Sequence, residues 1–343
     1  MPALSPVPEP SPRSRTPLSS TTLVTGALGC IGAWVVERLL DRGETPLVFD
    51  LGHDPRRVRD LVGEEGLERV QFVQGDIADA DALRSCIESH GVSQIVHLAG
   101  LQVPFCRADP TKGAMVNVVG TVNVFEAAAQ SGIERVAYAS SAAVYERADE
   151  ERAGGAPSED QAPHPNTHYG VYKLANEGTA RVSFLEHGVS SVGLRPLTVY
   201  GVGRDQGMTS GPTKAIKAAV LGRPYTIGFS GHTDFLYARD CAEAFLAAAA
   251  GGPKGAHVLN LSGTSVTVDS FVDTLCAVDP GARGKIHVDG PELPVPGAIA
   301  GGRLGDTLPG LEQTTIEDGI AETRARFQAL ERVGLLDSRD LDA

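Results

Sequence analysis

Tyr169 and Lys173 stand four residues apart in the stretch Tyr169-Gly-Val-Tyr-Lys173, a spacing that places both side chains on one face of a helix. A cation near a phenol stabilises the phenolate and lowers the pKa of the phenol, so this pair could act as a general base or acid. Ser141 could hydrogen-bond the same substrate oxygen and fix its geometry. The three residue types predict chemistry at a hydroxyl group that loses or gains a hydride, provided that the fold brings them together.

A glycine-rich stretch near the N-terminus predicts the binding site for the cofactor of such a reaction. Residues 22–25 have strand character, Gly26, Gly29 and Gly32 follow, and an amphipathic helix comes next. A helix N-terminus after such a turn presents backbone N–H groups and a favourable dipole, and the missing Cβ atoms let a pyrophosphate approach closely. The spacing GxxGxxG is weak evidence by itself, because the chain contains 40 glycines.

Asp50 ends a second predicted strand, over residues 46–50, and follows Gly32 at the distance where a dinucleotide fold places a ribose-binding acid. A carboxylate there accepts hydrogen bonds from the ribose hydroxyls and repels a 2′-phosphate, so we predict NAD rather than NADP. The alternative is a turn residue after a strand. Arg56 and Arg57 follow in what reads as a polar loop, where we expect both side chains to be solvated.

Further strands are predicted over residues 70–77, 94–100, 135–141, 191–195 and 256–262, with a long helix over residues 111–130. Strands that alternate with helices predict an α/β fold, a Rossmann-type doubly wound parallel sheet with a smaller C-terminal substrate-binding lobe. Ligands of such sheets bind at the carboxyl ends of the strands. Residues with suitable chemistry fall at these ends: Gly26, Asp50, Asp76, Gly100 and Ser141.

Composition excludes several classes of partner. The formal net charge of −13 disfavours nucleic acid and anionic membrane surfaces. Five cysteines without a CxxC pair predict reduced packing residues and no metal site. No stretch is apolar enough to span a bilayer, and residues 1–21, rich in Pro and Ser, lack the apolar core of a signal peptide. We therefore predict a disordered tail over 1–21 and a cytoplasmic protein.

Taken together, the motifs resemble those of the extended short-chain dehydrogenase/reductases, the group of NAD-dependent nucleotide-sugar epimerases and dehydratases. The resemblance runs from about residue 22 to 265 and includes TGALGCIG, HLAG, NVVGTVNVFEAA, ASSAAVY, YGVYK and RPLTVYGVGR. It implies a Ser141/Tyr169/Lys173 triad, NAD with its nicotinamide beside Tyr169, and a homodimer paired through the long helices. The cofactor site that it implies comprises Gly26, Gly29, Cys30, Ile31, Gly32, Asp50, Asp76, Ile77, Leu98, Ala99, Gly100, Asn117, Lys173, Pro196 and Val199.

Three departures from that family's pattern narrow the function. Ala142 and Ala143 occupy the positions where sugar-nucleotide 4,6-dehydratases carry an Asp-Glu pair, which disfavours a dehydratase. Thr233 replaces the arginine that usually clamps the substrate's diphosphate, and Val295 replaces a second phosphate-binding arginine. Charged hydrogen bonds contribute about 1.5–3 kcal/mol each, so losing both clamps weakens diphosphate binding by several kcal/mol. Arg204 or Arg303 could compensate.

The remaining segments predict where the substrate binds. We expect a NAD-binding domain over 22–200 plus 235–263 and a substrate-binding lobe over 201–234 and 264–343. Asp240 is expected to cap a helix over 241–250. The polar residues of the 201–234 segment could meet a sugar acid or polyol, or could cap turns only. The predicted substrate contacts are Ser141, Ala142, Tyr169, Arg204, Gln206 and Thr209.

Three functions fit these observations. The first is an NAD-dependent dehydrogenase or ketone reductase that acts on a secondary hydroxyl of a sugar-like small molecule. The second is a nucleotide-sugar epimerase that retains its NAD. The third is a non-catalytic NAD-binding sensor, which the preserved Tyr169 and Lys173 disfavour.

Overall fold

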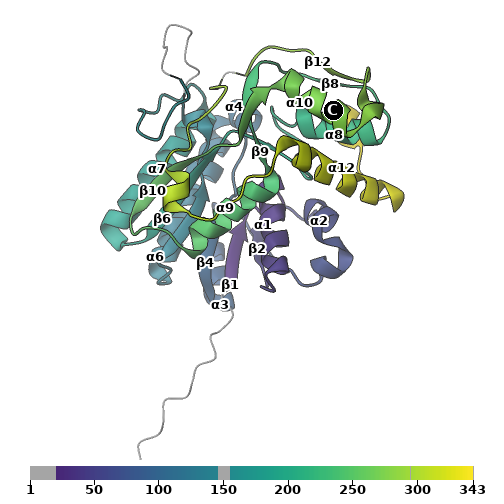
Figure 1. The fold of residues 1–343 in the computed structure, drawn as a ribbon. Helices are drawn as coiled ribbons and strands as arrows, with labels where there is room; N and C mark the ends of the chain where they lie inside the picture. The colour runs from purple at the N-terminus through teal and green to yellow at the C-terminus, as the bar shows by residue number, and fades with distance from the viewer. Residues whose placement is uncertain (1–20, 146–154, 294, 343) are drawn as a thin grey trace, which may run out of the picture.

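A seven-stranded parallel sheet lies at the centre of the computed structural model, which describes residues 21–145, 155–293 and 295–342 (Figure 1). Its strand order is β10-β6-β5-β4-β1-β2-β3, as a Rossmann-type fold requires. The strands are β1 (Thr21–Thr25), β2 (Leu47–Asp50), β3 (Gln71–Gln74), β4 (Val92–His97), β5 (Arg135–Ala139), β6 (Ser190–Pro196) and β10 (Ala256–Leu261). The predicted tail over 1–21 lies outside the described residues, apart from Thr21.

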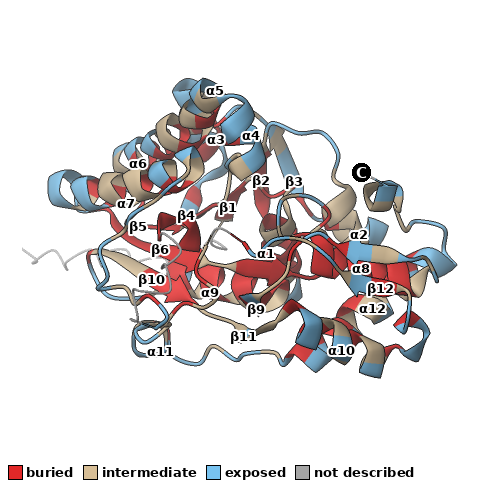
Figure 2. Ribbon diagram, turned by 90° about the horizontal axis from the view of Figure 1, so that it is seen from above, coloured by how far each residue is buried: buried red, intermediate tan, exposed pale blue. Residues whose placement is uncertain are grey.

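Helices cover both faces of this sheet (Figure 2). α1 packs with α2 and α9 on one face, and α6 packs with α3 and α7 on the other. Because both faces are covered, β1 and β2 are buried along nearly their whole length and show no alternation of buried and exposed residues. The six helices are α1 (Cys30–Asp41), α2 (Arg56–Leu67), α3 (Ala80–His90), α6 (Gly120–Gln130), α7 (His168–His187) and α9 (Ala238–Ala250).

Local signals set the ends of the helix that carries Tyr169 and Lys173. The Thr167 side chain accepts a hydrogen bond from the backbone N–H of Gly170 and so caps the N-terminus of α7. Gly188, with φ +75°, ends the helix in the left-handed conformation that glycine adopts readily. These caps set where α7 begins and ends, and so place Tyr169 and Lys173 in its first two turns.

The helix predicted over 111–130 is interrupted. α5 (Pro110–Ala114) leads into a π-helical turn (Met115–Val119), and α6 follows. Single π turns inside α-helices are frequent at functional sites. This one contains Asn117, whose side chain is fully buried.

Smaller elements form a second lobe beside the carboxyl ends of the main sheet. β7 (Thr198–Tyr200), β9 (His232–Tyr237) and β11 (Thr264–Thr267) make a three-stranded sheet, and β8 (Tyr225–Ile227) pairs with β12 (Ile286–Val288). Helices α8 (Gly211–Val220), α10 (Val268–Val278) and α12 (Ile316–Arg332) pack around them, whereas α11 (Leu304–Thr307) lies against β10 of the main sheet. Short helices complete the described chain: α4 (Val103–Ala108) and 3₁₀ turns Ala142–Val144, Pro280–Ala282 and Arg339–Asp342.

The prediction that Asp240 caps a helix was wrong. α9 already begins at Ala238, and the Asp240 carboxylate accepts hydrogen bonds from the backbone N–H and hydroxyl of Thr314 at 2.6 and 2.7 Å. Asp240 therefore holds the 310–315 segment against α9. Among the described residues, no helix has the length and hydropathy needed to traverse a lipid bilayer.

Candidate active site

The turn between β1 and α1 forms a backbone cradle. Gly26 has φ +70°, and a Cβ atom built there would lie 2.5 Å from the backbone nitrogen of Ala99. A Cβ on Gly32 would lie 2.5 Å from the Cα atom of Ala27. Gly29 is the N-cap of α1 and carries no side chain that could occupy the helix terminus. The cradle therefore exposes the N–H groups of α1 to an anion and fits the pyrophosphate of a dinucleotide.

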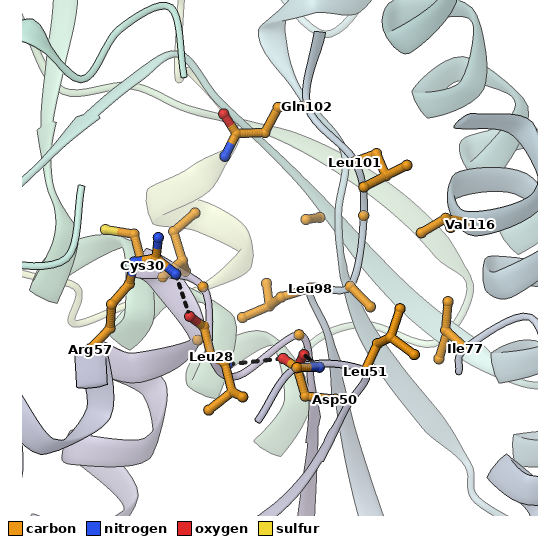
Figure 3. A pocket seen from close by; sticks show the side chains of 18 of the residues that line it. Leu28, Cys30, Asp50, Leu51, Arg57, Ile77, Leu98, Leu101, Gln102 and Val116 are labelled. Carbon is orange, nitrogen blue, oxygen red and sulfur yellow. Dashed lines mark hydrogen bonds between the residues drawn. The ribbon is translucent and has the colours of Figure 1, made fainter. Parts of the chain in front are cut away.

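Asp50 lies next to this cradle at the end of β2 (Figure 3). Its carboxylate accepts hydrogen bonds from the N–H of Leu28 at 3.0 Å and of Gly52 at 2.9 Å. These bonds hold the carboxylate at the rim of a cavity of about 570 Å³ and leave lone pairs for the hydroxyls of a ribose. The site thus fits NAD at both the pyrophosphate and the ribose.

Tyr169 and Lys173 line the same cavity from α7. The Lys173 ammonium donates to the carbonyl of Ala139 at 2.8 Å and lies 5.6 Å from the centre of the Tyr169 ring. The Tyr169 hydroxyl hydrogen-bonds the side chain of Ser141, the second residue after β5. The structure therefore brings the three predicted catalytic side chains together.

The electrostatics of this group differ from the sequence-based expectation. Burial raises the pKa of Tyr169, while the hydrogen bond with Ser141 and the charge of Arg204 act to lower it. Burial also lowers the pKa of Lys173 to about 8. Among the protein's own groups, the cation that lowers the Tyr169 pKa is thus Arg204, and the expected lowering by Lys173 is not found.

Most predicted site residues line the cavity, and five do not. The residues at its wall are Gly26, Gly29, Cys30, Ile31, Gly32, Asp50, Asp76, Ile77, Leu98, Ala99, Gly100, Tyr169, Lys173, Pro196, Arg204 and Gln206. Ser141 lies behind the wall and hydrogen-bonds Tyr169. Thr209 also lies behind the wall and accepts a hydrogen bond from Arg204. Ala142, Asn117 and Val199 are buried behind the wall. The Asn117 amide donates to the carbonyl of Gly113 at 3.0 Å, so it supports the loop and helix around the cavity.

Sequence reasoning missed Gln102, which lines the cavity beyond β4 (Figure 3). It follows the carboxyl end of a central strand, so the rule that placed Gly100 in the site could also have found Gln102.

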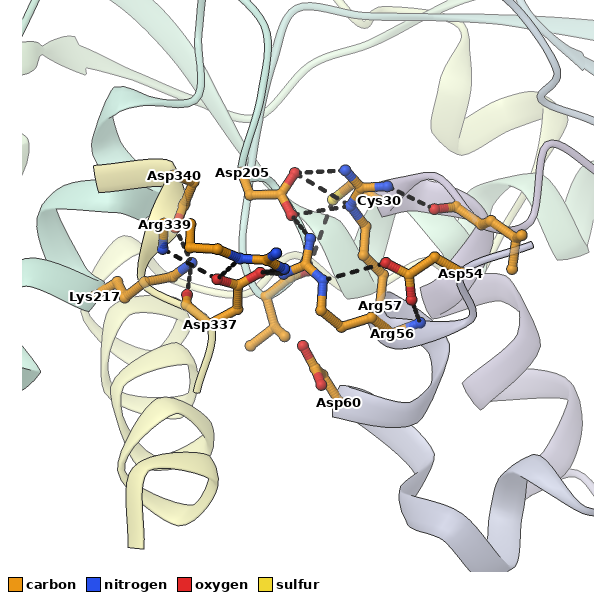
Figure 4. Close-up of polar contacts among 12 residues, drawn as sticks. Cys30, Asp54, Arg56, Arg57, Asp60, Asp205, Lys217, Asp337, Arg339 and Asp340 are labelled. Atoms are coloured by element: carbon orange, nitrogen blue, oxygen red, sulfur yellow. Dashed lines mark hydrogen bonds and ion pairs between the residues drawn. The ribbon is translucent and has the colours of Figure 1, made fainter. Parts of the chain in front are cut away.

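The expectation that Arg56 and Arg57 are solvated was wrong. They begin α2, and only 19% of each side chain is exposed. Both bind Asp205, with Arg56 Nη2 2.8 Å from Oδ2 and Arg57 Nη2 2.7 Å from Oδ1 (Figure 4). Arg57 also donates to the carbonyl of Leu28 at 2.8 Å. This cluster joins the glycine-rich turn to the loop after β7, a pairing that local sequence could not reveal.

The two positions of the expected diphosphate clamps are neutral and occupied with other contacts. Thr233 is fully buried in β9, where its hydroxyl lies 2.6 Å from that of Thr198. Val295 packs against the main hydrophobic core. Arg303 is exposed and forms an ion pair with Asp160. None of these three side chains lines the cavity at Tyr169.

Known proteins resemble this chain in sequence and in fold. A family profile described as "NAD dependent epimerase/dehydratase family" matches residues 22–261. The chain is 32% identical to a UDP-glucose 4-epimerase of Mycolicibacterium smegmatis, over 90% of this chain and 98% of that protein. The solved structure of MoeE5 with UDP-glucose and NAD is 29% identical, with a TM-score of 0.74 over 92% of this chain and 100% of that chain. A partial consensus L-threonine 3-dehydrogenase, at 23% identity and a TM-score of 0.78 over 90% and 99% of the two chains, shares the fold.

Proposed function

Since the chain belongs to the NAD dependent epimerase/dehydratase family and has NAD as its cofactor, we propose that it is an oxidoreductase. We propose that it interconverts a secondary alcohol and a ketone on a sugar-like small molecule that carries no nucleotide. NAD, when bound, accepts or returns the hydride. The protein's own residues supply binding, orientation and proton transfer.

Tyr169 is the proposed general base for the alcohol and the general acid for the ketone. Tyr169 lines the cavity, where its hydroxyl oxygen could take the hydroxyl proton of a substrate. Ser141, already hydrogen-bonded to that oxygen, orients the substrate oxygen. Arg204 is the cation that stabilises the Tyr169 phenolate. Lys173, held by the carbonyl of Ala139, keeps its ammonium at the cavity wall, where it would bind the cofactor.

One observation favours a substrate without a diphosphate: both clamp positions are neutral. Thr233 carries no charge, and its hydroxyl is buried in a strand and hydrogen-bonded to Thr198, so it cannot bind a phosphate in the site. Val295 is apolar and packs, partly buried, against the hydrophobic core. A diphosphate taken from water needs charge-assisted partners, so these residues support a smaller ligand.

The second candidate is a nucleotide-sugar epimerase that retains its NAD. The identity of 32% with a UDP-glucose 4-epimerase, along 98% of that protein, favours it. The two candidates differ in products: the dehydrogenase releases NADH, whereas the epimerase returns the hydride and changes only stereochemistry.

Calorimetric titration of the NAD-loaded protein with UDP, dTDP, GDP, ADP and CDP tests the proposal. We expect no binding at low micromolar concentration, because neither clamp residue is charged. Low-micromolar binding of any one nucleotide would contradict the proposal and favour the epimerase.

We also propose the organisation in which this activity operates. Residues 22–200 plus 235–263 form the NAD-binding domain, and residues 201–234 with 264–343 form the substrate-binding lobe. The protein acts in the cytoplasm as a homodimer.

A further inference from the structure

Arg204 lies in the loop after β7 and lines the cavity together with Tyr169, Gln102 and Gln206. Its Nη2 atom donates to the hydroxyl of Thr209 at 2.7 Å, which fixes the direction of the guanidinium. The group is thus held at the wall of the proposed active site by a neutral partner.

No carboxylate within the described ranges forms an ion pair with Arg204. Its Nε atom is buried and has no hydrogen-bond partner among those residues. The adjacent Asp205 cannot neutralise it, because Arg56 and Arg57 bind both carboxylate oxygens at 2.7–2.8 Å (Figure 4). Arg204 therefore carries an uncompensated, partly buried charge, which an anionic ligand would stabilise.

The charge of Arg204 acts on the reacting centre. It lowers the pKa of the Tyr169 phenol against the effect of burial. Arg204 and Tyr169 line the same cavity, so an anion bound at Arg204 would lie in the cavity that holds the hydroxyl that Tyr169 deprotonates. Gln102 and Gln206 add neutral hydrogen-bonding groups to this part of the wall.

We propose that Arg204 binds a carboxylate of the substrate, so that the enzyme acts on hydroxy acids such as aldonic or uronic acids. One guanidinium flanked by neutral amides matches a monoanion, and the planar fork of arginine matches the geometry of a carboxylate. This inference rests on the proposed function, because it names the substrate class of the same site.

The first experiment measures NADH formation by the whole protein with matched pairs of substrates. D-glucuronate, D-gluconate and D-glycerate are compared with D-glucose, D-glucitol and glycerol. We expect turnover of at least one acid and a kcat/KM for its uncharged partner at least about 10-fold lower, as loss of a charged hydrogen bond predicts. Equal turnover of acids and uncharged partners overturns the carboxylate inference and leaves the proposed function intact. Absence of NADH from all six substrates contradicts both.

The second experiment compares Arg204→Gln and Arg204→Lys with Arg303→Gln, which removes an exposed guanidinium that lies outside the cavity. With the acid substrate, Arg204→Gln should raise KM about 10- to 100-fold, and Arg204→Lys should raise it less. Arg303→Gln should leave KM unchanged. The pH profile of oxidation should shift to higher pH in Arg204→Gln, because the Tyr169 pKa rises.

Calorimetry separates the possible anions. In the NAD-loaded Tyr169→Phe protein, adding Arg204→Gln should abolish binding of the acid. In the apoprotein, Arg204→Gln should leave the Kd of NAD within about twofold, since no phosphate contact is lost. A Kd of NAD that rises as much as the KM of the acid would assign Arg204 to the cofactor's pyrophosphate and overturn the inference. Arg204-dependent binding of UDP would assign it to a diphosphate, with the same consequence.

Discussion

Asp205→Asn should destabilise the fold strongly, because Asp205 is the shared partner of Arg56 and Arg57. Only 7% of its side chain is exposed, and it accepts from Arg56 at 2.8 Å and from Arg57 at 2.7 Å. Removing one partner of a buried ion pair costs about 3–5 kcal/mol. Arg56 keeps Asp337 at 3.2 Å and Arg57 keeps the carbonyl of Leu28, so we expect the lower end, about 3 kcal/mol.

Urea unfolding followed by circular dichroism measures this loss as a shift of the midpoint at constant slope. Asp160→Asn is the matched control, because it breaks an exposed pair with Arg303 and should cost less than about 1 kcal/mol. The bonds of Asp205 to Arg57 and the charges of both arginines outweigh burial and lower the pKa of Asp205. The stability that Asp205 contributes is therefore present above the pKa of an unfolded Asp, about 3.9, and is lost as pH falls through the lower folded pKa. Equal midpoints for the two variants at neutral pH would refute this account.

Two further predictions concern a buried acid and an exposed helix face. Burial raises the pKa of Asp60 to about 6, and its Oδ1 atom has no hydrogen-bond partner among the described residues. Because the folded pKa exceeds the unfolded value of about 3.9, ionisation of Asp60 lowers the stability of the folded protein as pH rises through about 4 to 6. Asp60→Asn should therefore raise the melting temperature at pH 8 and not at about pH 3; an equal change at both pH values would contradict this. Leu185 and Val182 are 69% and 41% exposed on α7, an apolar surface that fits the proposed dimer interface. Leu185→Glu should therefore convert the dimer to a monomer in light scattering. Val333, which is 67% exposed at the end of α12, is the control, and Val333→Glu should leave the dimer intact. A wild-type monomer would contradict the dimer.

The fold could be predicted from local patterns in the sequence. Strands that are buried on both faces lack the alternating pattern of a half-exposed sheet, and glycines mark the turns after β1 and α1. The carboxyl-end rule grouped Gly26, Asp50, Asp76 and Gly100, and all four line one cavity. These features are visible because each depends on a few consecutive residues.

Contacts between distant residues could not be predicted in this way. Asp205 lies 148 residues beyond Arg57, and Thr314 lies 74 residues beyond Asp240. Nothing near Arg57 or Asp240 in the sequence indicates these partners, so solvation and helix capping were the natural interpretations. The pKa of Tyr169 was misjudged for a related reason, since the burial that raises it and the Arg204 charge that opposes it come from the tertiary structure.

The central claim is that Tyr169 serves as the acid–base of a net oxidation of a free, non-nucleotide substrate. The most direct test incubates the wild type and Tyr169→Phe with NAD and either free sugar acids or UDP-glucose, and follows NADH absorbance and products by NMR. We predict NADH and a keto product from a free acid, lowered about 10²- to 10⁴-fold in Tyr169→Phe, and no reaction of UDP-glucose. Conversion of UDP-glucose to its C4 epimer without net NADH would contradict the claim.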